Sequence, residues 1–229
     1  MGLKDTLKSI QSKIESAQER GGFNRPVQLI AVTKTHPFSL MQKCYDSGII
    51  AIGENRIQEA SQKFESFNNM SNLTRRFIGH LQSNKVNKCL ELFDTIDSVD
   101  SLKLARKISN AALRLEKTIP VLLEINTSGE SQKNGFLSNQ IDEIGECFQE
   151  SNIKIDGLMT VGPRTTDTEK IRESFIQLRE LRDLINQSLN QPNMRELSMG
   201  MSGDYEIAAE EGSTMVRLGT VLFGRRDSF

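Results

Sequence analysis

Short apolar runs alternate with longer amphipathic stretches along the whole chain. The clearest run, Ile119 to Asn126, is rich in β-branched residues and has the length of a buried strand. The same pattern predicts eight strands in all, at residues 27–33, 49–52, 76–79, 95–99, 119–126, 155–161, 196–199 and 214–218.

The stretches between the apolar runs predict helices. In residues 168–189 the apolar side chains recur at spacings of three and four, which places them on one face of a helix. An amphipathic helix pattern also covers residues 1–14 at the start of the chain, and Gly21-Gly22 is a stop signal for that first helix. The other expected helices cover residues 38–47, 56–67, 83–92, 101–115, 138–150 and 204–211.

This order of elements predicts an α/β fold with a parallel sheet. The connections are too long for hairpins, so neighbouring strands must run in the same direction. Eight such units in a chain of this size favour a closed barrel over a doubly wound sheet. Because no Pro/Gly/Ser-rich linker divides the chain, we expect residues 1–229 to form a single (β/α)8 TIM-type barrel domain with an extra N-terminal helix.

Composition excludes several classes of protein. Lys and Arg number 29 and Asp and Glu number 30, so no basic excess favours nucleic acid. The three cysteines are far apart and form no C-x-x-C pair, which fits a reducing compartment without disulfides. Two histidines are too few for a His-rich metal site. No apolar run approaches the ~20 residues of a membrane span, and we expect a cytoplasmic protein that binds neither nucleic acid nor membrane.

The residues that follow the strands are the candidates for chemistry, because working residues of parallel barrels lie at the C-terminal strand ends. Lys34 ends the apolar run 29–32, where burial would lower its pKa and leave a nucleophilic amine. By position alone, a lysine that extends to solvent explains the pattern equally well. A reactive lysine here would support either Schiff-base aldolase chemistry or pyridoxal phosphate chemistry.

Two later strand ends narrow the choice. Ser202-Gly203 and Gly219-Thr220 each combine a hydroxyl with a glycine turn, and phosphate commonly binds between strands seven and eight of a barrel. Arg217 lies two residues before Gly219, so both face the same side of the strand. The alternatives are tight βα turns without a ligand and a structural ion pair for Arg217.

At this point the sequence resembles the pyridoxal phosphate homeostasis proteins, the small single-domain relatives of the alanine racemase barrel (fold type III). The matching segments occur in order along nearly the whole chain, and together they are specific. They are AVTKT (31–35), IGENRIQE (52–59), FIGHLQSNK (77–85), EINTSGE (124–130), GLMT (157–160), LSMGMS (197–202), GSTMVRLGT (212–220) and FG (223–224).

The resemblance implies a cofactor and its contacts. Pyridoxal 5′-phosphate would be bound covalently as a Schiff base on Lys34, and Arg217 would face its ring nitrogen. The phosphate would lie on Ser202, Gly219 and Thr220, and the ring would be lined by Asn55, His80 and Met199.

Arg217 restricts the chemistry of such a site. An arginine only donates hydrogen bonds, so the ring nitrogen opposite it stays unprotonated and the cofactor is a weak electron sink. Transamination and decarboxylation are then disfavoured, whereas racemisation needs an acid/base on each face of the substrate. In the resembled racemases a second, β-rich domain supplies a tyrosine, and we expect this chain to lack that domain. Only Tyr45 and Tyr205 are present, and Tyr205 is the sole substitute.

We therefore expect a monomeric protein with no catalytic residues that binds pyridoxal phosphate, buffers it, and passes it to apoenzymes that depend on it. The runner-up is a slow amino-acid racemase that uses Lys34 with Tyr205 or a water. A cofactor-free lysine aldolase and a pure interaction protein are the remaining readings. The last does not explain why Lys34, Arg217 and two glycine-hydroxyl turns all follow strands.

Overall fold

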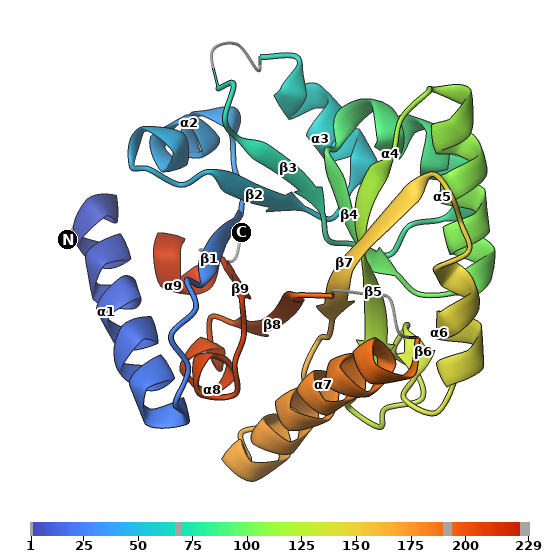
Figure 1. Ribbon diagram of the computed structural model, residues 1–229. Coiled ribbons are helices and arrows are strands. Elements are labelled where there is room, and N and C mark those ends of the chain that lie inside the picture. The colour runs from blue at the N-terminus through green and yellow to red at the C-terminus, as the bar shows by residue number, and fades with distance from the viewer. Residues whose placement is uncertain (1, 67–69, 190–193, 225–229) are drawn as a thin grey trace.

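Parallel strands close a barrel in the computed structural model, which describes residues 2–66, 70–189 and 194–224. The last barrel strand returns to pair with the first, with Gln28 opposite Met215 and Ala31 opposite Leu218. The predicted eight-stranded barrel is thereby confirmed (Figure 1). In ring order its strands are β1 (Gln28–Val32), β2 (Ala51–Glu54), β3 (Thr74–Phe77), β4 (Thr95–Val99), β5 (Ile119–Asn126), β7 (Ile153–Met159), β8 (Glu196–Met201) and β9 (Met215–Leu218).

Helices surround the strands, and the extra N-terminal helix lies beside the C-terminal part of the chain (Figure 1). Lys13 and Arg20 on this helix form ion pairs with Glu206 and Glu210 on the helix that follows β8. The helices are α1 (Leu3–Gly21), α2 (Phe38–Asp46), α3 (Ile57–Phe64), α4 (Val86–Leu92), α5 (Leu102–Arg114), α6 (Ile141–Cys147), α7 (Thr168–Ser188), α8 (Tyr205–Glu210) and α9 (Thr220–Phe223).

The structure adds three short elements to the predicted pattern. A two-residue strand, β6 (Phe136–Leu137), pairs with the end of β5. The four-residue helix α9 follows β9, and a 3₁₀ turn, η1 (Ser83–Lys85), forms the start of the helix expected at 83–92. Elements this short carry no periodicity, so the pattern could not show them. The predicted ends at residues 1, 67 and 229 lie outside the described residues.

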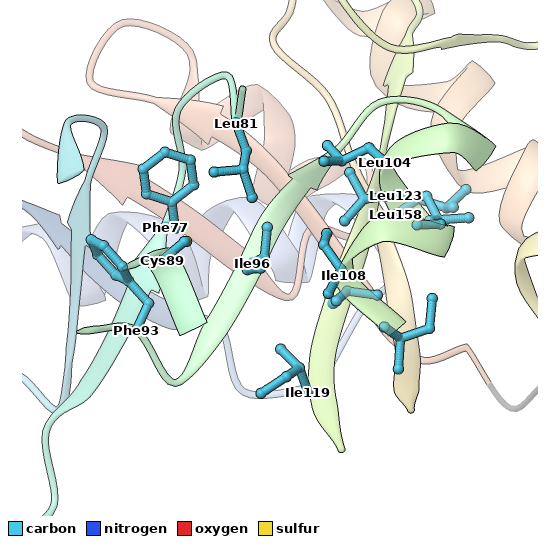
Figure 2. Packing of buried hydrophobic residues seen from close by; sticks show 14 of the residues in the cluster. Phe77, Leu81, Cys89, Phe93, Ile96, Leu104, Ile108, Ile119, Leu123 and Leu158 are labelled. Carbon is cyan, nitrogen blue, oxygen red and sulfur yellow. The ribbon is translucent and has the colours of Figure 1, made fainter. Parts of the chain in front are cut away.

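The main apolar core packs the strands against the helices from α2 to α8, and Figure 2 shows part of it. Phe77 points outward from β3 and meets Phe93 edge-on, with ring centroids 5.1 Å apart. Leu104 and Ile108 of α5 belong to the same cluster and are buried. Each such side chain contributes about 1.5–3 kcal/mol of transfer free energy when it is fully buried. The packing between strands and helices therefore holds the barrel in shape.

The barrel interior holds a small apolar cluster, as expected for a barrel filled by side chains. It consists of Ile30, Ala51, Leu122, Met159 and Met215. Polar groups lie beside this cluster, where the Arg217 guanidinium donates to the Ser198 hydroxyl and to the Thr160 carbonyl. The candidate site opens next to Arg217.

The described residues contain no disulfide and no metal site built from cysteine and histidine. All three cysteines are free and buried, and burial raises the pKa of the Cys44 and Cys147 thiols to about 12. Within the described residues, no group of three or more His, Cys, Asp or Glu side chains is placed to hold a metal ion. Across the same residues, no helix is both long and apolar enough to cross a membrane.

Candidate functional site

A cavity of about 400 Å³ opens at the C-terminal ends of β1, β8 and β9. This volume is typical of small-molecule sites, which span about 300–1,000 Å³. Five of the eight predicted site residues line it together: Lys34, Ser202, Arg217, Gly219 and Thr220. Gly203, from the turn predicted together with Ser202, also lines it. The lining residues that were not predicted are Val32, His36, Ile78, Val161, Met201 and Gly224.

Lys34 reaches the cavity from a tight turn directly after β1. Thr33 is buried, Lys34 is half-buried, and Thr35 has a φ of 65°. A positive φ is unfavourable for a β-branched residue and costs about 1–3 kcal/mol. Surrounding contacts must hold this turn, so the direction in which Lys34 leaves the strand is fixed by the fold.

Ser202 and the start of α9 line the cavity with hydroxyl and backbone N–H groups. The Ser202 hydroxyl oxygen accepts the backbone N–H groups of Gly219 and Val221, each at 3.2 Å. A Cβ added to Gly203 would meet no heavy atom within 4 Å, so this backbone borders open space. First-turn N–H groups, a hydroxyl and an uncrowded glycine together suit a phosphate.

Arg217 forms the floor of the cavity and is buried. Its guanidinium donates to the Ser198 carbonyl at 2.7 Å, to the Ser198 hydroxyl at 2.8 Å and to the Thr160 carbonyl at 2.7 Å. Burial lowers the pKa of Arg217, and nearby carboxylates oppose that shift. Arginine keeps its charge at this depth because its ordinary pKa is above 12. The site thus has a fixed donor at its base.

Three acidic residues near Arg217 were missed by sequence reasoning: Asp97, Glu124 and Asp204. Burial raises the pKa of Glu124, with Asp100 adding to the effect and Arg217 opposing it. Burial also raises the pKa of Asp204, although Asp204 accepts the Met201 N–H at 2.5 Å. A signal existed for two of them, because a carboxylate inside a buried parallel strand must face the barrel interior or a partner.

Asn55 and His80 line a neighbouring cavity of about 360 Å³, with Phe77 in its wall. His80 is more than half exposed, and its Nδ1 lies 2.9 Å from Asp100 Oδ2. The two cavities lie beside each other at the end of β3, since Ile78 lines the first one. Asn55 and His80 therefore border a different cavity from the one that Lys34 lines.

Met199 and Tyr205 both lie in apolar clusters. Met199 is fully buried in the outer core, on the opposite side of β8 from Ser198, because side chains alternate along a strand. Its side chain is therefore turned away from the cavity. Tyr205 is buried against α1 with Leu7 and Ile10, and burial raises its pKa. Neither side chain lines the cavity within the described part of the chain.

Comparisons with known proteins agree on one family. A model of the alanine racemase N-terminal domain matches residues 6–227. A pyridoxal phosphate homeostasis protein of Aquifex aeolicus is 38% identical over 228 residues, which is 99% of each chain. The structure of PipY from Synechococcus elongatus, solved with PLP bound, has a TM-score of 0.87 at 33% identity and covers 97% of this chain and 100% of its own. An alanine racemase from Clostridium difficile shares the fold, with a TM-score of 0.76 at 18% identity over 98% of this chain and 58% of its own.

Proposed function

Because the chain belongs to the family of pyridoxal phosphate homeostasis proteins, we propose that it binds pyridoxal 5′-phosphate in the cavity at Lys34. The observation that carries the proposal is that an amine, a fixed arginine and hydroxyl and N–H donors all line one cavity. These groups fit the aldehyde, the ring nitrogen and the phosphate of this cofactor. A relative with PLP bound and the same fold supports this assignment.

Each lining group has a distinct task in this proposal. The Lys34 amine adds to the aldehyde carbon and water leaves, so that one C=N bond replaces the C=O bond in a reversible Schiff base. Ser202, Gly219 and Thr220 hold the phosphate through hydroxyl and backbone N–H groups. Arg217 donates towards the ring nitrogen and keeps it unprotonated. When bound, the cofactor supplies an electrophilic aldehyde and an electron sink, and Arg217 weakens that sink.

We propose that the protein holds and releases the cofactor and does not turn over amino acids at a useful rate. A racemase needs a second acid/base opposite the lysine. Tyr205, the sequence candidate for that role, packs against α1 instead. Reversible attachment then serves to buffer a reactive aldehyde and to pass it to apoenzymes. The cytoplasmic location, the monomeric state and the single domain over 1–229 stay predictions.

Borohydride reduction of the purified, cofactor-loaded protein followed by peptide mass mapping tests the proposal. We expect a pyridoxyl adduct on the Lys34 peptide that is lost in Lys34→Ala. The exposed Lys43 on α2 gives a matched control, and Lys43→Ala should keep the adduct. A loaded protein without an adduct on Lys34 would contradict the covalent assignment. Rapid conversion of an L-amino acid to its D-form would contradict the non-catalytic role.

A further inference from the structure

Charged side chains of β2 and α3 pack against the turn that carries Lys34, and the sequence pattern did not reveal their contacts. Lys63 on α3 donates to the Thr33 carbonyl at 2.8 Å, to Glu54 Oε1 at 2.8 Å and to Glu59 Oε1 at 2.7 Å. A lysine ammonium has three donors, so this geometry uses all of them. Lys63 thereby ties the end of β1 to the end of β2 and to its own helix.

This charge cluster, formed by Glu54, Glu59 and Lys63, makes hydrogen bonds to the residues on both sides of Lys34. On one side the Thr33 hydroxyl donates to Glu54 Oε1 at 2.6 Å, and the Thr33 carbonyl accepts from Lys63. On the other side the Thr35 backbone N–H donates to Glu59. Lys34 is thus the one residue between two anchored neighbours.

The hydrogen bond from Thr35 to Glu59 explains how Thr35 keeps its positive φ. A threonine with a φ of 65° persists only where surrounding contacts hold it there. The hydrogen bond to Glu59 acts at this residue, and Glu59 is itself held by Lys63 four residues along α3. Loss of the cluster would let Thr35 relax to a negative φ, which would redirect the chain that carries Lys34.

Stability alone does not explain why these charges are buried. Glu54 is fully buried and Lys63 is 9% exposed. Apolar side chains of similar volume are often as stabilising as a buried ion pair, so such a pair is weak evidence for a role in stability. Within the described residues, Oε2 of Glu54 is buried without a hydrogen-bond partner, and burial raises the pKa of Glu54. A costly arrangement placed against the reactive turn points to a role in that turn.

We propose that Lys63, Glu54 and Glu59 are positioning residues for Lys34, which hold its backbone so that the amine stays directed into the cavity. This inference rests on the proposed function, because it concerns the bond between Lys34 and the cofactor aldehyde. A reacting group held in one direction loses less freedom on reaction, so attachment is faster. The proposed phosphate donors follow β8 and β9 or begin α9, and they lie outside this cluster. The charge cluster should therefore control the covalent attachment of the cofactor to Lys34 and leave binding of its phosphate unchanged.

Two ligands separate these effects. Pyridoxal 5′-phosphate reports attachment through the rate of its absorbance change, and pyridoxine 5′-phosphate, which has no aldehyde, reports non-covalent binding alone. We expect Lys63→Met and Glu59→Met to slow attachment by about tenfold or more. Their affinity for pyridoxine 5′-phosphate should stay within about twofold of the parent. Glu65→Met, at the exposed end of the same helix, is the matched control and should change neither quantity.

A rescue sharpens the test. Glycine adopts a positive φ without strain, so Thr35→Gly added to Glu59→Met should restore part of the attachment rate. Unchanged attachment in folded Lys63→Met and Glu59→Met would overturn the proposal, as would an equal loss with both ligands. If Lys63→Met does not fold, Glu59→Met with its rescue carries the test. An unmodified parent protein that forms no Lys34 adduct would instead contradict the proposed function itself.

Discussion

Ser202→Ala is the most direct test of the proposed phosphate site, because the hydroxyl has two separable tasks. Its oxygen accepts the N–H groups of Gly219 and Val221, each at 3.2 Å. Loss of a hydroxyl that caps first-turn N–H groups costs about 1 kcal/mol of folding free energy. In a chain of 229 residues this loss lowers Tm by about 2–4 °C.

The effect on affinity follows from the proton of the same hydroxyl. A hydroxyl can accept two hydrogen bonds and still donate one, so Ser202 can cap α9 and bind phosphate at the same time. A hydrogen bond to a charged group contributes about 1.5–3 kcal/mol. In the variant the two uncapped N–H groups can turn to the phosphate and recover about 1 kcal/mol of this. The net loss of about 0.5–2 kcal/mol weakens pyridoxal 5′-phosphate by roughly 2- to 30-fold.

The assay is an absorbance titration of cofactor-free protein with pyridoxal 5′-phosphate and, in parallel, with pyridoxal. Pyridoxal lacks the phosphate, so its affinity should be the same in Ser202→Ala and in the parent. Ser39→Ala on the exposed surface of α2 is a matched control that should alter neither titration. An equal loss for both ligands, or no loss for either, would show that Ser202 does not hold the phosphate.

Three further substitutions test the framework of the site. Gly157→Ala should prevent correct pairing of β7 with β8 and yield little folded protein on expression, because a Cβ there would lie 1.9 Å from the Glu196 carbonyl oxygen. Arg217→Met should lower the free energy of unfolding by about 1–3 kcal/mol in urea denaturation, since it leaves the buried Ser198 and Thr160 carbonyls without the hydrogen bonds that its guanidinium donates; a fully stable variant would refute this role of the guanidinium. Glu210→Gln should cost about 1 kcal/mol at neutral pH. Hydrogen bonds from Arg172 and Arg20 hold the pKa of Glu210 below its ordinary 4.5, so the ionised form stabilises the fold above that pH and the benefit is lost as pH falls through the lowered value. The difference in Tm between Glu210→Gln and the parent should therefore shrink towards zero on acidification, and a constant difference would contradict this reading.

The barrel was predictable from the sequence because its strands are apolar runs of a length that a buried parallel strand requires. The turns at Ser202 and Gly219, which line the cavity, were visible for a similar reason, since glycine and hydroxyl residues directly follow strands. These features depend on residues that are close together in the chain, so they can be predicted from short stretches of sequence. The elements β6 and α9 were not predictable, because two and four residues are too short for any period.

Features that depend on contacts between residues far apart in the chain could not be predicted from the pattern of apolar and polar positions. Lys63 looks like an ordinary helical lysine in the sequence, and only the packing of α3 on β1 and β2 reveals its three acceptors. Met199 stands beside cofactor-like motifs in the sequence, but strand alternation turns its side chain outward. Asn55 and His80 follow the right strands and yet border the adjoining cavity. Proximity along the chain is therefore a good guide to which end of the barrel a residue occupies, and a poor guide to which cavity it faces.

The pairing of β1 with β9 has a consequence for how the protein is made. Lys34 leaves the ribosome early, whereas Arg217 and Gly219 emerge near the end of synthesis, and synthesis proceeds at about 5–20 residues per second. Until β9 arrives, β1 has an open edge and the lysine has neither a floor nor phosphate donors beside it. The nascent chain can therefore expose a lysine but cannot assemble its pocket. Under the proposed function, loading of Lys34 with the cofactor is then a late event that follows closure of the barrel, and a chain stalled before β9 should bind no cofactor in the cavity.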